Sequence, residues 1–231
     1  MEPSERFAAE IRAAQDDAEL AKILRYFTTG PDEVFIGVRM GTIFGLAKKH
    51  LDLPAPDIER LLESEVHEDR VGACSVMGKA AAHPRASEDR RRELYELYLR
   101  RSDRINNWDL VDLAAPAVLG GWLLDKPRDP LYALARSERW PDRRSALLAT
   151  ARFIKAGEVT DALALSELLI DDEHEYVTKA AGWMLRYAGD ADRAALVAFL
   201  DAHAAAMPRV MLGNALEHFS AEEKAHYRAL R

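Results

Sequence analysis

Hydrophobic residues recur along most of the chain at the spacing of a helix that buries one face. In the segment that begins at Asp17, the apolar side chains at one face are Leu20, Ile23, Leu24 and Phe27. Apolar positions three and four residues apart predict amphipathic helices. The alternating Val, Ile, Thr and aromatic residues that would predict strands are almost absent. The pattern therefore predicts an all-α protein.

Polar breaks, Pro and Gly divide the chain into many such segments, joined by short connections. The expected helices cover 5–15, the segment from 17, 39–50, the segment from 54, 67–82, the segment from 87, 109–124, 130–138, 142–155, 160–169, 176–187, 190–203, 208–219 and 221–230. Short connections imply antiparallel neighbours. Helix pairs then recur at roughly 35–45 residues, as in HEAT-like repeats. We expect one continuous domain over 1–231, a HEAT-like α-α superhelix with a concave inner surface.

Composition and charge narrow the range of partners and cellular locations that the protein could have. The net charge of −7 argues against a nucleic-acid partner, but 32 Lys and Arg residues are partly clustered, so one face could still be basic. A mixed-charge, solvated surface is the simpler interpretation. The single cysteine, Cys74, excludes an internal disulfide and fits a cytoplasmic protein, and it is expected to be a packing residue. No signal peptide or membrane span is predicted.

Several kinds of site are excluded by missing residues. No Gly-rich phosphate loop is present. His67-Glu68 and His174-Glu175 resemble the beginning of a helical zinc motif, but the positions of the second histidine hold Val71 and Thr178. We therefore predict no metal and no cofactor.

Three places carry unusual residues. Trp108 and Asp112 are four residues apart and share a helix face, although a capped helix start with a half-buried Trp is the commoner explanation of such a pair. Gly182 precedes Trp183 inside an expected helix, where glycine usually marks the close approach of another backbone or a ligand. In Trp140-Pro141-Asp142-Arg143-Arg144, one arginine could bind phosphate, although a surface ion pair is commoner.

At these residues the chain resembles the AlkD-type family of DNA alkylation-repair glycosylases. The resemblance lies in the order and spacing of short pieces rather than in one motif. They are Gly37-Val38-Arg39, Leu46 to Lys49, Ser64 to Arg70, Ile105 to Asp112, Arg143 to Thr150, Lys179 to Arg186 and Met207-Pro208-Arg209.

The resemblance implies a HEAT-like superhelix that holds duplex DNA on its concave face and excises cationic alkylpurines such as 3-methyladenine and 7-methylguanine. It implies Asp112 as the catalytic carboxylate, Trp108 and Trp183 as the aromatic site residues, and Arg144 as the phosphate contact, with Arg143 as the alternative. The other expected DNA contacts are Arg39, Lys179 and Arg186. We expect a cytoplasmic monomer.

The chain departs from the family pattern at two basic positions. Gly41 and Phe44 stand where the family often has Pro and Arg, and Gly213 and Asn214 stand where Arg and Tyr are common. Fewer cations weaken the expected affinity for DNA. Two alternatives to the glycosylase stay open: a non-catalytic solenoid that binds damaged or branched DNA, and a solenoid that binds a protein partner.

Overall fold

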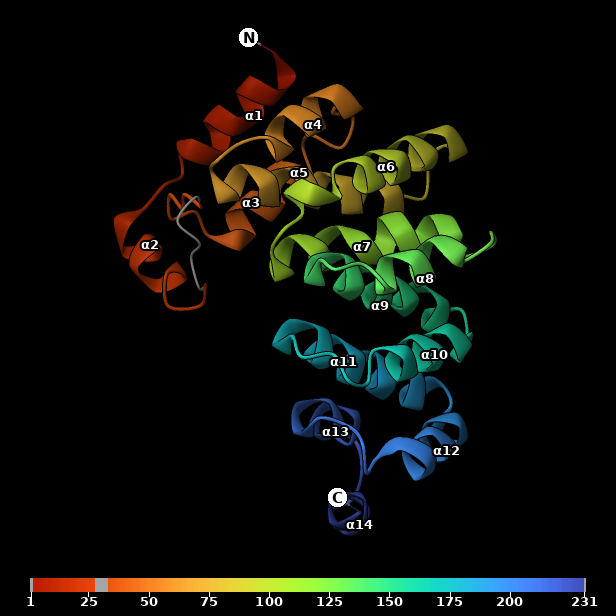
Figure 1. Ribbon diagram of the computed structural model, residues 1–231. Coiled ribbons are helices and arrows are strands. Elements are labelled where there is room, and N and C mark those ends of the chain that lie inside the picture. The colour runs from red at the N-terminus through yellow and green to blue at the C-terminus, as the bar shows by residue number, and fades with distance from the viewer. Residues whose placement is uncertain (1, 28–32, 231) are drawn as a thin grey trace. The chain divides into compact units, whose positions relative to one another are not determined.

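The computed structural model describes residues 2–27 and 33–230, and in this part of the chain every regular element is a helix. The all-α prediction is therefore confirmed. The only strand-like pairing among these residues is an isolated parallel bridge between Val34 and Val66. None of the described helices combines the length and apolarity needed to cross a membrane. The elements, labelled in Figure 1, are α1(Pro3–Arg12), α2(Asp17–Ile23), α3(Met40–Ala47), α4(Ala55–Leu62), α5(His67–Ala82), α6(Glu88–Arg100), the 3₁₀ helix η1(Ser102–Arg104), α7(Trp108–Leu123), α8(Asp129–Ala135), α9(Trp140–Lys155), α10(Thr160–Leu168), α11(Glu175–Ala191), α12(Arg193–His203), α13(Arg209–Ala215) and α14(Ala221–Ala229).

The contacts within the chain divide it into two compact units, residues 1–118 and 119–231. In the first unit, α5 packs against α3, α4 and α6, while α4 also contacts α1 and α6. Most residues of α5 are buried, including both polar and apolar ones. Because α5 is enclosed on all sides, its polar residues must find partners inside the protein. The prediction of one continuous domain stays a prediction.

The second unit is a two-layered stack of antiparallel helix pairs. One layer is formed by α9, α11 and α13, which contact one another in that order, and the other by α8, α10 and α12. Each layer contacts the other through consecutive helices, such as α8 with α9 and α10 with α11. This is the arrangement of an α solenoid, in which each helix pair buries its apolar stripe against the next pair.

Glycine at position 182 has the packing role that the sequence predicted. A Cβ atom added to Gly182 would lie 2.6 Å from the backbone oxygen of Met211, so α11 and α13 approach too closely there for a side chain. Glycine lowers the intrinsic stability of the helix by about 1 kcal/mol relative to Ala, and the close packing of α11 on α13 offsets this loss. Trp183 is therefore carried on a helix that is fixed against its neighbour.

Most predicted helices agree with the structure within a few residues, and α5 agrees at both ends. One expectation about burial is wrong. The apolar face of α2 was expected to be buried, but none of its residues is buried, and Leu24 just beyond it is 48% exposed. The helix has only seven residues. It is too short to form a full apolar stripe that another helix could cover.

Candidate functional site

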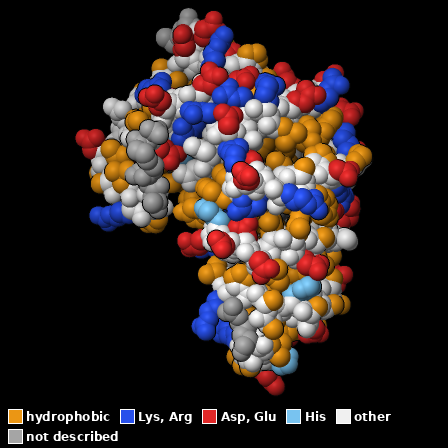
Figure 2. Space-filling model, viewed as in Figure 1, with side chains coloured by type: hydrophobic (Ala, Val, Ile, Leu, Met, Phe, Trp, Pro, Cys, Tyr) orange, Lys and Arg blue, Asp and Glu red, His pale blue; other side chains and the backbone are white. Residues whose placement is uncertain are grey.

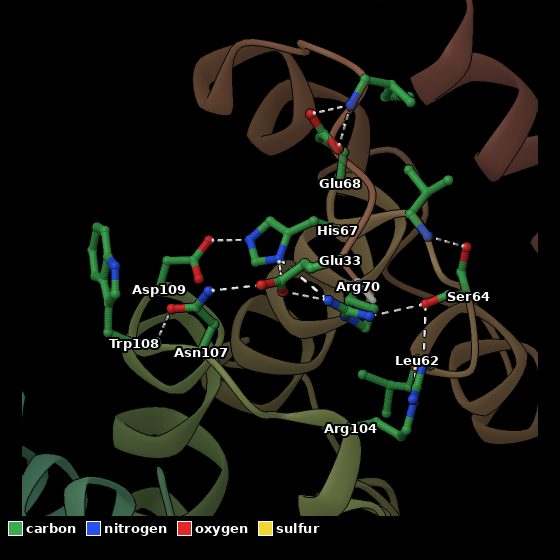
Figure 3. Close-up of polar contacts among 12 residues, drawn as sticks. Glu33, Leu62, Ser64, His67, Glu68, Arg70, Arg104, Asn107, Trp108 and Asp109 are labelled. Atoms are coloured by element: carbon green, nitrogen blue, oxygen red, sulfur yellow. Dashed lines mark hydrogen bonds and ion pairs between the residues drawn. The ribbon is translucent and has the colours of Figure 1, made fainter. Parts of the chain in front are cut away.

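Four consecutive ionisable residues, His67, Glu68, Asp69 and Arg70, open α5, and all four are almost completely buried. Burying charged groups is costly unless each is paired and hydrogen-bonded. Successive residues of a helix point in directions about 100° apart, so the four side chains reach neighbours on different sides of α5. The start of α5 therefore makes many buried polar contacts with other segments of the first unit (Figure 3).

Glu68 fixes the segment that precedes α3. Its carboxylate accepts hydrogen bonds from three consecutive backbone N–H groups, those of Ile36, Gly37 and Val38. Gly37 has φ of +78°, a conformation that favours glycine, and this turn lets the three N–H groups converge on one acceptor. Since Glu33 and Phe35 lie just before this turn, Glu68 also sets where their side chains can reach.

His67 lies between two carboxylates. Its Nδ1 is 2.8 Å from Glu33 Oε1 and its Nε2 is 2.8 Å from Asp109 Oδ2 (Figure 3). A neutral imidazole has one N–H donor, so only the imidazolium satisfies both acceptors. Burial opposes that charge, but the hydrogen bonds to Asp109 and Glu33 outweigh it and raise the pKa of His67 to about 9. Both the geometry and the direction of the pKa shift favour the imidazolium at neutral pH.

Glu33 collects three donors from two elements. Arg70 Nη2 donates to its Oε1 at 2.5 Å, beside the bond from His67, and the Asn107 side-chain amide lies 3.4 Å from its Oε2. Burial favours the neutral acid, but the bonds and charges of His67 and Arg70 prevail and lower the pKa of Glu33. Asn107 also accepts the backbone N–H of Trp108, the first residue of α7, at 2.8 Å, which satisfies one of the free N–H groups at the start of that helix.

Trp108 lies at the edge of an aromatic cluster. Its ring is 5.4 Å from that of Phe27 at an interplanar angle of 13°, and Phe27 in turn contacts Phe35 and His67. The ring of Phe35 stacks on the imidazole of His67 at 4.5 Å. Trp108 is half-buried. One indole face therefore lies against Phe27, whose own ring is held by Phe35 and His67.

The two carboxylates in the first turns of α7 have different surroundings. Asp109 is 2% exposed and is bound to His67, whereas Asp112 is half-buried and lies one turn after Trp108. Residues four apart on a helix share a face, so Asp112 and Trp108 lie on the same side of α7. Asp109 anchors the helix, whereas the side chain of Asp112 keeps part of its surface exposed to solvent.

In the second unit, Arg144 and Trp183 lie together. The Arg144 guanidinium is 5.3 Å from the centre of the Trp183 ring, and its Nη1 donates to the backbone oxygen of Tyr176 at 2.5 Å. Arg144 is 1% exposed, while Trp183 is half-buried. The arginine is thus a fixed buried charge behind an accessible indole. Its contact with a phosphate stays a prediction.

Arg143 points elsewhere and has its own partners. It donates to both carboxylate oxygens of Asp172, at 2.5 and 3.1 Å, and to the backbone oxygens of Ser137 and Glu138. A guanidinium with this many partners holds the segment before α9 in place. Of the two arginines that the sequence left open, Arg144 is the one that lies beside Trp183.

The remaining predicted DNA contacts are all paired with glutamates in the structure. Arg39 lies 3.1 Å from Glu19, Lys179 pairs with Glu175, and Arg186 pairs with Glu217. On the face drawn in Figure 2, Lys and Arg are likewise interspersed with Asp and Glu. A phosphate would compete with these carboxylates for the cations.

The roles of His67, Asp109 and Glu33 do not follow from the sequence, in which His67 stood out only as a possible zinc ligand. A repeat would have drawn attention to His67. Ser64-Glu65-Val66-His67-Glu68-Asp69-Arg70 and Ser137-Glu138-Arg139-Trp140-Pro141-Asp142-Arg143 share Ser, Glu, Asp and Arg at the same places. Each begins an enclosed helix, and His67 and Trp140 are equivalent in the two.

The structure offers little for other chemistry. Within 2–27 and 33–230, no group of three His, Cys, Asp or Glu side chains is placed to hold a metal ion. Cys74 is fully buried in α5, and burial raises the pKa of its thiol. It is therefore a poor nucleophile, in agreement with a packing role.

The fold defines an all-helical protein with solenoid-like helix pairs, and the comparisons add the family. The family model of the DNA alkylation repair enzyme matches residues 7–219, so the chain belongs to that family. Among solved structures, a "Predicted DNA alkylation repair enzyme from Enterococcus faecalis" is similar with a TM-score of 0.69 at 16% sequence identity, over 90% of this chain and 97% of that one. This likeness concerns the fold alone. No curated protein matches the chain.

Proposed function

We propose that the protein is a DNA glycosylase that excises cationic alkylated purines, of the 3-methyladenine and 7-methylguanine type, from duplex DNA and so initiates base-excision repair. Membership of the DNA alkylation repair family supports DNA as the partner. The observation that carries the proposal is the difference in surroundings between the two carboxylates at the start of α7. Asp109 is buried against His67, which leaves half-buried Asp112 on the same face as half-buried Trp108.

Alkylation of a ring nitrogen gives the purine a positive charge and makes it a good leaving group. When the N-glycosidic bond breaks, its electron pair passes to the purine and neutralises that charge. A water molecule forms the new bond to the sugar C1′ and loses a proton. We assign Asp112 two tasks: stabilising the cationic sugar in the transition state and accepting that proton.

Indole rings suit a cationic lesion. Trp108 and Trp183 are both half-buried and have ring surface for a cation, a contact that contributes roughly 0.5–2 kcal/mol. Arg144, beside Trp183, supplies a positive charge for a backbone phosphate. The exposed Arg39 and the partly exposed Lys179 and Arg186 contribute further phosphate contacts once their glutamate partners are displaced. The reaction needs no metal or cofactor, and we propose a monomer that acts in the cytoplasm.

Asp112→Asn tests the proposal. We expect release of 7-methylguanine from methylated duplex DNA to fall at least a hundredfold, of the order seen when one transition-state charge contact is removed. Asp103→Asn is the matched control, because Asp103 is an exposed carboxylate in the preceding 3₁₀ helix η1. Circular dichroism checks the fold of both variants. Equal release by wild type and Asp112→Asn removes Asp112 from its role, and DNA binding without release in the wild type favours the non-catalytic alternative.

A further inference from the structure

His67 connects two segments that are far apart in the sequence, the loop that carries Glu33 and the first turn of α7. The loop is held to α5 a second time, because the backbone N–H of His67 donates to the oxygen of Val34 at 2.8 Å. On the other side, Nε2 of His67 contacts Asp109, the residue that follows Trp108 (Figure 3). The position of Trp108 therefore depends on the imidazole.

Asp109 depends on His67 more than Glu33 does. Glu33 also has Arg70 and Asn107 as partners. The Oδ1 atom of Asp109 is buried without a hydrogen-bond partner among the described residues, and the Oδ2 atom is bound to His67. Without the imidazolium, Asp109 would become a buried carboxylate with no counter-charge. Such a group moves toward water or takes up a proton, and either change disturbs the first turn of α7.

The charges around His67 show why a cation is needed there. Its neighbours are Glu33 from the loop, Arg70 from α5 and Asp109 from α7, with the rings of Phe27 and Phe35 against the imidazole. Two carboxylates and one guanidinium leave a negative charge, which the imidazolium neutralises. A neutral side chain at position 67 leaves that charge in an apolar cluster.

We propose that His67 is a positioning residue of the excision site: as an imidazolium it holds Asp109, and through Asp109 it holds the first turn of α7 in the position that presents Trp108 and Asp112. The inference rests on the proposed function for its effect on excision, but the state of the imidazole can be measured without any activity. His67 touches neither lesion nor sugar in this scheme.

Nitrogen-15 NMR of the histidine rings tests the ionic state in the wild-type protein, with His67 assigned from the spectrum of His67→Gln. Both ring nitrogens should show imidazolium shifts at pH 7.5. A neutral ring at that pH overturns the proposal. Should His67→Gln fail to fold, Asp109→Asn supplies the assignment, because the ring nitrogen bound to Asp109 changes its shift.

Single-turnover base release tests the connection to the site. We expect His67→Gln to lower the rate about tenfold, and His67→Gln combined with Asp109→Asn to recover to within about threefold of wild type, since the second change removes the uncompensated charge. A merely structural histidine predicts that the two losses add. The matched control is His50→Gln, because His50 stacks on Phe7 and bonds a single carboxylate, that of Glu10, away from α7. It should release base at the wild-type rate.

The outcomes separate the two ideas. Absence of release by the wild type contradicts the proposed function and leaves the NMR result on His67 to stand alone. Active wild type with unchanged His67→Gln contradicts the positioning role alone. A double variant that is no faster than His67→Gln also contradicts it, because the loss then does not pass through Asp109.

Discussion

The starts of α5 and α9 share one arrangement of hydrogen bonds, which we call the hook. It joins a serine before the helix to a backbone N–H, an aspartate and an arginine that follow it. In α5, the Ser64 hydroxyl donates to Asp69 at 2.7 Å and accepts the backbone N–H of Val66, while Arg70 donates to the Ser64 carbonyl at 3.1 Å. In α9, Ser137 makes the same bonds with Asp142, Arg139 and Arg143, at 2.8, 3.2 and 3.0 Å. Both hooks fix how the chain enters an enclosed helix.

The side chains that stand between and after the residues of the hook differ between the two helices. His67 in α5 sits in an ionic network with Glu33 and Asp109, whereas the equivalent Trp140 in α9 stacks on His174 at 4.5 Å with an interplanar angle of 10°. The residue after the hook is apolar Val71 in α5 and Arg144 in α9. The hook is therefore scaffold, and the residues between and after its members decide the chemistry.

The largest expected difference is in the free energy of unfolding that is lost when the main cation-binding carboxylate of each region, Glu33 or Asp172, is removed. Glu33→Ala leaves His67 and Arg70 without their shared carboxylate, and we expect a loss of about 4 kcal/mol in the free energy of unfolding. Asp172→Ala leaves Arg143 its two carbonyl partners, and we expect about 2 kcal/mol. Urea unfolding, with hydrogen exchange to assign the loss to α5 or α9, measures both. Equal losses would show that the two networks are equivalent.

The pH dependence should have opposite signs in the two regions. The pKa of His67 is raised to about 9 in the folded protein, so its contribution is complete below about 6.5 and disappears as the pH rises toward 9, roughly 3 kcal/mol in all. Burial lowers the pKa of His174, so its region loses stability as the pH falls below about 6.5. Hydrogen exchange of α5 and α11 as a function of pH checks this, and parallel trends in both helices would contradict it.

The smallest expected loss of stability comes from removing the serine hydroxyl that begins the hook in each region. Ser64→Ala and Ser137→Ala each remove one hydroxyl that donates to an aspartate and caps a backbone N–H. We expect each to cost about 1 kcal/mol, and the two losses to agree within about half of that. Thermal or urea unfolding measures them. A loss at only one position would mean that the hooks are not equivalent.

How much of this could be foreseen depends on whether a feature is local. The bounds of α5 follow from its apolar residues and from Pro84 beyond its end, and Gly182 indicated a close approach that the structure contains. Trp108 and Asp112 follow from spacing on one helix. The pairing of His67 with Glu33 and Asp109 could not be foreseen, because the three residues lie on different segments.

The local order of residues is enough to specify that the chain forms helices, where most of them begin and end, and which residues share a helix face, because these properties depend on neighbours within a few positions. Which charged residues are buried depends on how the helices pack. Asp109 and Asp112 look alike along the chain, yet one is enclosed beside His67 and the other stays half-exposed. The physical reason is that the energy of a charge depends on its counter-charge and its access to water, and both come from segments distant in sequence.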